Sequence, residues 1–259
     1  MKKLFKAIAV AALVGAAYLP SAHAVPVGLE LVLLVDVSGS VDSTEFGLQK
    51  TGYVNAFNSA AVQNAILGSQ LGAIAVTFVE WSGNNQQSQR VGWSMINSVA
   101  SAQSFATAIN NSTRAFTGRT AIQDAMIFGS GLFGNNGYEG LRLVMDVSGD
   151  GADNDTSGCN TIANARCGRD IALAAGVNAI NGLPILGESG LLSYYQSNVQ
   201  GGAGAFTLAA NSFSDFSAAV ERKLVTEITN KTPEPGSLAL VGLALAGLVG
   251  MRRRRRRNS

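Results

Sequence analysis

Short, nearly continuous apolar runs alternate along the chain with longer stretches in which apolar residues recur at helical spacing. The clearest runs, at residues 29–35, 71–79 and 141–147, have the length of strands buried on both faces of a parallel sheet. Shorter strands are expected at residues 89–93, 182–186 and 205–209. Helices are expected at residues 42–66, 98–110, 120–132, 169–181 and 213–229. This alternation predicts one α/β domain with a doubly wound, mostly parallel central sheet and helices on both faces.

The amino-terminal segment has the pattern of a secretory signal peptide. Lys2, Lys3 and Lys6 precede an apolar run that ends in the small-residue triplet Ala22-His23-Ala24. We expect cleavage after Ala24, so that residues 1–24 are removed and the body is exported. An uncleaved membrane anchor is the alternative. Because His23 is the only histidine, the mature protein would contain none.

The carboxyl-terminal segment combines a short motif, an apolar stretch and a basic block. Pro233, Glu234 and Pro235 are followed by apolar residues 238–251 and then by six arginines. As a helix, the apolar stretch would span about 21 Å, less than the roughly 30 Å of a bilayer core. The positive-inside rule places the arginines on the cytoplasmic side.

This order resembles the PEP-CTERM sorting signal of Gram-negative bacteria. The resemblance implies export across the inner membrane and transient membrane contact through a transmembrane helix in the tail. It also implies processing by an exosortase-type protease at Pro233, Glu234 and Pro235, and delivery to the cell surface or extracellular matrix. A plain anchor that stays in place is the alternative.

Composition limits what the body can do. The chain has 259 residues, 47% hydrophobic and 14% charged, which suffices for one sizeable domain and excludes a disordered polar chain. The net charge of +2 is misleading, because nine of the 19 Lys and Arg residues lie in the two ends. An acidic body at residues 25–232 lacks the cations that sequence-independent nucleic-acid binding needs, so no nucleic-acid partner is expected. The sorting tail then occupies residues 233–259.

Two cysteines are consistent with export. Cys159 and Cys167 lie in one polar segment, and outside the cytoplasm such a pair usually oxidises to a disulfide. A zinc site is not expected, because two cysteines without a mature histidine leave too few soft ligands.

Oxygen-bearing side chains collect where the predicted strands end. Asp36, Ser38 and Ser40 follow the first strand, Asp150 follows the strand at residues 141–147, and Thr120 opens a helix. In such sheets, ligands bind beyond the carboxyl ends of the strands. Two carboxylates and three hydroxyls form an all-oxygen set of the kind that hard divalent cations prefer, and Mg²⁺ takes few protein ligands.

The pattern resembles the metal-ion-dependent adhesion site (MIDAS) of a von Willebrand factor type A domain. The similarity extends to a bacterial subfamily of these domains without an assigned activity, through segments such as residues 33–42, 79–83 and 146–151. It implies that Asp36, Ser38, Ser40, Thr120 and Asp150 hold Mg²⁺ or Mn²⁺, with Ca²⁺ less suitable. It also implies an open coordination position for an acidic group of a partner.

The sequence also allows alternatives to this metal site. Asp36, Ser38 and Ser40 can form a simple helix-capping turn, or the metal can serve stability alone. Residues 146–157 partly imitate a Ca²⁺ loop, although Ser157 stands where a bidentate Glu is needed, and Asp153 and Asp155 offer an accessory cation site. Arg114 and Arg119 are expected on the solvated surface.

The sequence thus predicts an exported, metal-dependent binding or adhesion module that engages an acidic group on a protein or exopolysaccharide. A structural or assembly protein of an extracellular matrix is the first alternative. A metal-assisted hydrolase is the second. We expect no enzyme, because the mature chain has no histidine for general base catalysis.

Overall fold

A six-stranded sheet forms the centre of the molecule. The structure, a computed structural model, describes residues 23–157, Cys159 and residues 166–229. The strand order is β4 (Gln87–Ile96), β3 (Ile74–Trp81), β2 (Leu29–Asp36), β6 (Leu143–Gly149), β7 (Ala179–Pro184) and β8 (Gly201–Gly202). The four inner strands are parallel, and the edge strands β4 and β8 are antiparallel to their neighbours. A small parallel pair, β1 (Val25–Val27) with β5 (Tyr138–Gly140), lies beside it.

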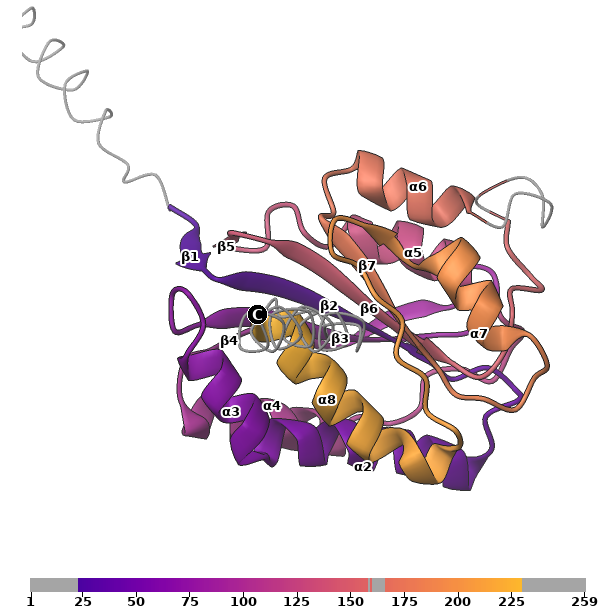
Figure 1. The fold of residues 1–259 in the computed structure, drawn as a ribbon, viewed down its shortest axis with the longest axis horizontal. Coiled ribbons are helices and arrows are strands. Elements are labelled where there is room, and N and C mark those ends of the chain that lie inside the picture. Colours follow the sequence, from indigo (N-terminus) through magenta and orange to yellow (C-terminus); the bar gives the residue numbers. More distant parts are fainter. Residues whose placement is uncertain (1–22, 158, 160–165, 230–259) are drawn as a thin grey trace, which may run out of the picture.

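Helices cover both faces of the sheet (Figure 1). One face carries α2 (Ser43–Asn58), α3 (Ala60–Leu67), α4 (Val99–Asn111) and α8 (Phe216–Thr229), the last preceded by the 3₁₀ turn η2 (Phe213–Asp215). The other face carries α5 (Ile122–Ser130), α6 (Cys167–Ala174) and α7 (Leu191–Tyr194), which continues into the π-helical turn η1 (Tyr195–Val199). The predicted doubly wound α/β fold is confirmed.

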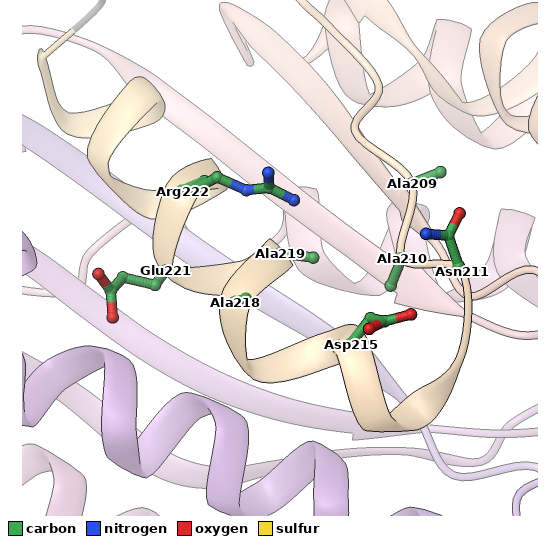
Figure 2. A pocket seen from close by; sticks show the side chains of 8 residues that line it. All are labelled: Ala209, Ala210, Asn211, Asp215, Ala218, Ala219, Glu221 and Arg222. Atoms are coloured by element: carbon green, nitrogen blue, oxygen red, sulfur yellow. The ribbon is translucent and has the colours of Figure 1, made fainter.

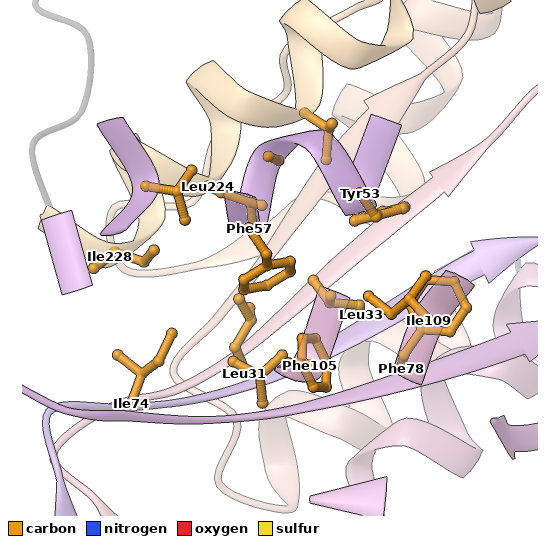
Figure 3. Close-up of a cluster of buried hydrophobic side chains, with 14 of the residues drawn as sticks. Leu31, Leu33, Tyr53, Phe57, Ile74, Phe78, Phe105, Ile109, Leu224 and Ile228 are labelled. Carbon is orange, nitrogen blue, oxygen red and sulfur yellow. The ribbon is translucent and has the colours of Figure 1, made fainter. Parts of the chain in front are cut away.

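Strand β2 supplies both halves of the core because alternate side chains point to opposite faces. Leu31 and Leu33 pack with Phe57 and Phe105 under the face that carries α2 and α8 (Figure 3). Val32 and Leu34 pack with the α5 side. All eight residues of β2 are buried, as expected for a central strand of a covered parallel sheet.

The helix expected at residues 42–66 is two helices. Its start is as predicted: Asp42 accepts from the Glu45 amide, and Glu45 accepts from the Asp42 amide in a capping box. Ser59 interrupts the helix because its backbone is extended, with ψ 144°, and its side chain caps α3. A hydroxyl that can cap a helix competes with the helical backbone around it.

The carboxyl-terminal half differs more from the prediction. Helix α6 ends at Ala174, earlier than expected, and Gly176 follows with φ 104°, a left-handed conformation that stops a helix. The strand expected at residues 205–209 is wrong as a full strand, because Thr207 and Ala210 make only isolated bridges to β7. In the amino-terminal half, strand β4 is longer than the expected residues 89–93.

The last helix runs back to the edge of the sheet where the parallel strands begin. Arg142, immediately before β6, donates to the backbone carbonyl of Glu227 at 3.0 Å. Within the described residues, no helix is both long and apolar enough to cross a bilayer. The predicted signal peptide and sorting tail lie outside the described residues.

Candidate metal site

The loops after β2 and β6 meet at the carboxyl edge of the sheet. The Ser38 and Ser40 hydroxyls are 3.0 Å apart, and the Ser40 hydroxyl donates to Asp150 Oδ1 at 2.7 Å. Ser38 and Asp150, far apart in the sequence, are therefore both within hydrogen-bonding distance of Ser40. Asp36, the last residue of β2, accepts from the Ser38 backbone amide at 2.7 Å. The predicted cluster thus assembles around the Ser40 hydroxyl.

Asp36 lies at the bottom of this cluster and is fully buried. Its Oδ1 accepts the Ser38 amide, but its Oδ2 has no hydrogen-bond partner. Burial raises the pKa of Asp36 to about 7, with a smaller contribution from the charge of Asp150. Burying a carboxylate oxygen without a partner costs free energy, and a proton or a cation bound to this atom would offset that cost.

Gly149 and Tyr195 complete the floor of the site. A Cβ on Gly149 would lie 2.7 Å from Asp36 Oδ2 and 2.8 Å from the Tyr195 hydroxyl, so only glycine leaves room for both groups. Tyr195 is fully buried, and its hydroxyl has no hydrogen-bond partner. No sequence pattern predicts Tyr195 at the site, because Tyr195 lies on a π-helical turn far from Asp36 in the sequence and belongs to no local motif.

Thr120 enters the site from the loop before α5. Its backbone amide donates to the Asn154 side chain at 3.1 Å, and the Asn154 amide donates back to the Thr120 carbonyl at 2.8 Å. These paired bonds fix the Thr120 loop against the Asp150 loop. A cavity of about 610 Å³ results, and its lining residues are Gly39, Ser40, Gly118, Arg119, Thr120, Asp150, Gly151, Ala152, Asp153, Asn154, Gly187 and Glu188. The structure therefore brings Thr120 to the cavity that holds Ser40 and Asp150.

Arg114 braces the first loop from beneath, contrary to the surface role expected for it. Its guanidinium donates to the carbonyls of Val37, Ser38 and Val41 at 2.7–2.9 Å. All three bonds come from Nη2, while Nε donates to the Phe116 carbonyl at 2.9 Å, so the planar guanidinium joins the first loop to the segment around Phe116. Arg119 is exposed as predicted, with 71% of its side chain accessible.

The acidic residues beyond Asp150 hold the loop instead of forming a Ca²⁺ loop. Asp153 accepts from the Gln123 amide and from the Thr156 amide and hydroxyl, and Asp155 accepts from the Asn84 amide. The first residue of the alternative Ca²⁺ loop, Asp146, lies inside β6 and pairs with a lysine. The Ca²⁺-loop alternative is therefore wrong, because its first ligand is taken up inside the sheet, whereas an accessory cation at Asp153 and Asp155 stays a prediction.

The predicted disulfide between Cys159 and Cys167 is present, with Cα atoms 5.8 Å apart. Cys167 is the first residue of α6, and the next amide, of Gly168, donates to the Gln123 side chain at 2.8 Å. The disulfide thus joins the long loop after Asp150 to a helix that packs beside α5. The predicted sorting motif at Pro233, Glu234 and Pro235 lies outside the described residues.

The donor set fits a hard divalent cation. Two carboxylates and hydroxyls converge at the cavity, and the buried Asp36 oxygen without a partner is the atom that a cation would satisfy. Among the described residues, no three His, Cys, Asp or Glu side chains gather in a group that could hold a metal ion. The set depends on hydroxyls, which excludes a soft metal site of the cysteine and histidine type. Metal binding by the five residues stays a prediction.

A separate hollow of about 320 Å³ lies between α8 and the segment before η2 (Figure 2). Ala210 and Ala219 line its inner side, with Asp215 and Arg222 at its margin. It shares no residue with the cavity at Asp150. The two hollows are therefore independent.

Comparison with solved structures identifies the class of fold. Proximal thread matrix protein 1 from the mussel byssus matches with 15% identity and a TM-score of 0.58, over 80% of this chain and 48% of that chain. The pilus adhesin SpaC from Lactobacillus rhamnosus GG matches with 19% identity and a TM-score of 0.56, over 80% of this chain and 31% of that chain. The von Willebrand factor domain of the type V pili tip protein Mfa5 from Porphyromonas gingivalis matches with 10% identity and a TM-score of 0.54, over 82% and 98%. The fold is that of a von Willebrand factor type A domain, and this chain spans less than half of the first two solved chains.

Two protein families match the sequence directly. Residues 26–232 match the family described as "Protein of unknown function (DUF1194)", and the chain belongs to this family. Residues 231–256 match the PEP-CTERM protein-sorting motif, which confirms the resemblance of the tail and indicates an exported protein that is sorted to the cell surface. No curated protein matches the chain.

Proposed function

We propose that this protein is an exported binding module whose site at Asp36, Ser38, Ser40, Thr120 and Asp150 holds Mg²⁺ or Mn²⁺ and engages a carboxylate of an extracellular partner. The observation that carries the proposal is the convergence of the Ser38, Ser40 and Asp150 oxygens above the unpartnered Asp36 Oδ2. When bound, the cation would supply an electrophilic centre for a carboxylate oxygen. The protein's residues would orient it with few anionic ligands, which leaves its charge incompletely neutralised.

Two of the similar structures support a site of this kind. A second structure of the mussel thread matrix protein is described as having a zinc-occupied MIDAS motif, and it shares 16% identity with this chain. SpaC is described as a pilus adhesin. The fold alone does not assign a function. The donor geometry of this chain is therefore the stronger support.

The surface beside the site favours a polypeptide partner over a polysaccharide. A third hollow, of about 430 Å³, adjoins Asp150 and Glu188, and the exposed or half-buried side chains of Leu48, Leu186 and Phe213 contribute apolar surface to it. Leu48 is 37% exposed. An acidic side chain bound at the cation would place a neighbouring apolar side chain in this hollow, where burial would add affinity.

We also propose that the protein is not an enzyme. Histidine is absent after His23, and the two cysteines form a disulfide, so neither a general base histidine nor a free thiol serves the site. The buried Asp36 and the hydroxyl groups instead suit binding. A matrix assembly protein in which the metal only stabilises the loops is the competing function, and it differs in requiring no partner at the cation.

The first test is a titration of the purified protein with Mn²⁺, followed by electron paramagnetic resonance of the free ion. We expect saturable binding at one site. Asp36→Ala and Ser38→Ala should abolish it or weaken it at least tenfold, about 1.4 kcal/mol or more. Asp42→Asn is the matched control, because Asn also caps a helix and the Asp42 carboxylate accepts from the Thr44 and Glu45 amides at the start of α2. Binding that survives in Asp36→Ala would refute the metal site.

The second test separates the partner classes. Bound Mn²⁺ accelerates water relaxation, and a carboxylate that enters its coordination shell should reduce this effect. A water-soluble copolymer of L-glutamate and L-leucine should reduce it at lower concentration than polygalacturonate if the apolar hollow accepts a leucine side chain. No change with either polymer would favour the purely structural metal site.

A further inference from the structure

A second group of charged side chains lies inside the core, on the face of the sheet covered by α2 and α8. Lys223 on α8 places its Nζ 2.7 Å from Asp146 Oδ1 on β6 and 2.6 Å from Glu227 Oε1 on its own helix. All three side chains are 0% exposed. None of the five predicted metal ligands belongs to this group.

The group is poorly satisfied as an ordinary ion pair. Both oxygens of Asp146 and Oε2 of Glu227 have no hydrogen-bond partner, and the close approach of Lys223 to Asp146 lacks hydrogen-bond alignment. Two carboxylates face a single ammonium in an apolar environment. Buried charges normally persist only with full pairing and hydrogen bonding, so this arrangement is costly if all three groups stay ionised.

The surroundings exclude water and fix the reacting groups. The ring of Phe206 lies 5.8 Å from Lys223 Nζ, and the buried side chain of Tyr53 packs on the same face of the sheet. Asn181 donates to Glu227 Oε1 at 2.9 Å and accepts from the Phe206 amide at 3.0 Å, which orients the Glu227 carboxyl group. Burial, and secondarily the charge of Asp146, raises the pKa of Glu227 to about 7.

We propose that Lys223 and Asp146 condense spontaneously into an intramolecular isopeptide bond, with Glu227 transferring the proton. The structure holds the reactant pair: an amine and a carboxyl group in contact, beside a second carboxyl group that touches the amine.

The chemistry balances without a cofactor. The neutral Lys223 amine attacks Cγ of protonated Asp146, and Glu227 takes a proton from the nitrogen and delivers it to the departing Asp146 oxygen. A C–N bond forms, a C–O bond breaks, one water leaves, and Glu227 ends in its starting protonation state. Fixed contact between reactants replaces a bimolecular encounter, which accelerates such reactions by many orders of magnitude.

The product would link the last described helix to a central strand of the sheet. It would replace two opposite buried charges by an uncharged amide and leave Glu227 hydrogen-bonded to Asn181. For an exported protein, such a link would resist both heat and mechanical extension of α8.

Peptide mapping of the purified full chain, reduced and denatured before digestion, tests the proposal. We expect a branched peptide that joins the segments around Asp146 and Lys223 and is lighter by one water than the two linear peptides together. Trypsin should not cleave after Lys223. Recovery of only linear peptides, with a Lys223 amine that is open to acetylation under denaturing conditions, would overturn the proposal.

Two variants check the chemistry. Glu227→Gln should fold, by circular dichroism, and yield linear peptides. Asp146→Asn should either stay linear or lose ammonia instead of water. Glu221→Gln, a half-buried position on the same helix, is the matched control and should form the link like the parent. If the unsubstituted protein gave a branched peptide that joins Lys223 to Asn181 and has lost ammonia, the assignment to Asp146 would be refuted. If the Glu227→Gln protein were fully linked, the role of Glu227 would be refuted.

Discussion

Substitution of Gly149 by alanine tests whether the floor of the candidate site is as tightly built as the structure shows. Gly149 is the last residue of β6, and its backbone conformation is one that alanine readily adopts. The added methyl group would lie 2.7 Å from Asp36 Oδ2 and 2.8 Å from the Tyr195 hydroxyl. Both neighbours are fully buried, so neither can move into open solvent.

The expected cost follows from this crowding. Extra methyl groups in a well-packed interior typically destabilise a protein by about 1–3 kcal/mol. For a domain of about 150–250 residues, each kcal/mol lowers the melting temperature by roughly 2–4 °C. Because the added methyl group clashes with Asp36, it should displace the carboxylate from the ion and lower the Mn²⁺ affinity. A loss of about 1.4 kcal/mol in binding free energy corresponds to a tenfold lower affinity.

Urea unfolding measures the first effect, and Mn²⁺ titration measures the second. Gly92→Ala is the matched control, since Gly92 also lies in a strand but an added Cβ there would meet nothing within 4 Å. Its stability and Mn²⁺ affinity should match the parent. If Gly149→Ala were as stable as Gly92→Ala and bound Mn²⁺ like the parent, the packing argument for Asp36 would be wrong.

Three further predictions concern the disulfide, the loop held by Arg114 and the buried Glu227. Removing the disulfide in a Cys159→Ser, Cys167→Ser double variant should lower the free energy of unfolding by about 2–3 kcal/mol, measured with urea; an unchanged midpoint would contradict this. Arg114→Lys should cost about 2–3 kcal/mol and weaken Mn²⁺ binding, because one ammonium cannot bind the Phe116 carbonyl and the first-loop carbonyls together, whereas Arg119→Lys should change neither. Burial raises the pKa of Glu227 from 4.5 to about 7, so the folded protein binds more protons than the unfolded chain between these values. The free energy of unfolding of the protein should fall as pH rises through that range, by at most about 1 kcal/mol per pH unit. The fall should be smaller in Glu227→Gln, and an equal fall would contradict the assignment of this pH dependence to Glu227.

Local sequence patterns were sufficient for the sheet centre and for the cluster at its carboxyl edge. Strand β2 is a continuous apolar run, and Asp36, Ser38 and Ser40 follow it at once, so topology alone places them at one edge. The capping pair of Asp42 and Glu45 likewise acts between neighbouring residues. These features depend on interactions over a few residues, which a sequence shows directly.

The features that were missed depend on contacts between distant segments. Arg114 gives no sign in the sequence that it will bind the carbonyls of a loop more than 70 residues earlier. Tyr195 approaches Asp36 only because Gly149 has no side chain. The Lys223 pair with Asp146 joins two elements with no shared motif. Weakly paired edges such as β8 were missed for the same reason, because two glycines carry no hydrophobic pattern.

The contact between Arg142 and the last turn of α8 has a consequence for how the molecule is displayed. It fixes the end of the described chain at the margin where the parallel strands begin, and Asp36 and Asp150 lie at the far margin where those strands finish. A tether made through the residues after Thr229 would therefore hold the body by its base. The cluster of oxygens would then face away from the tether.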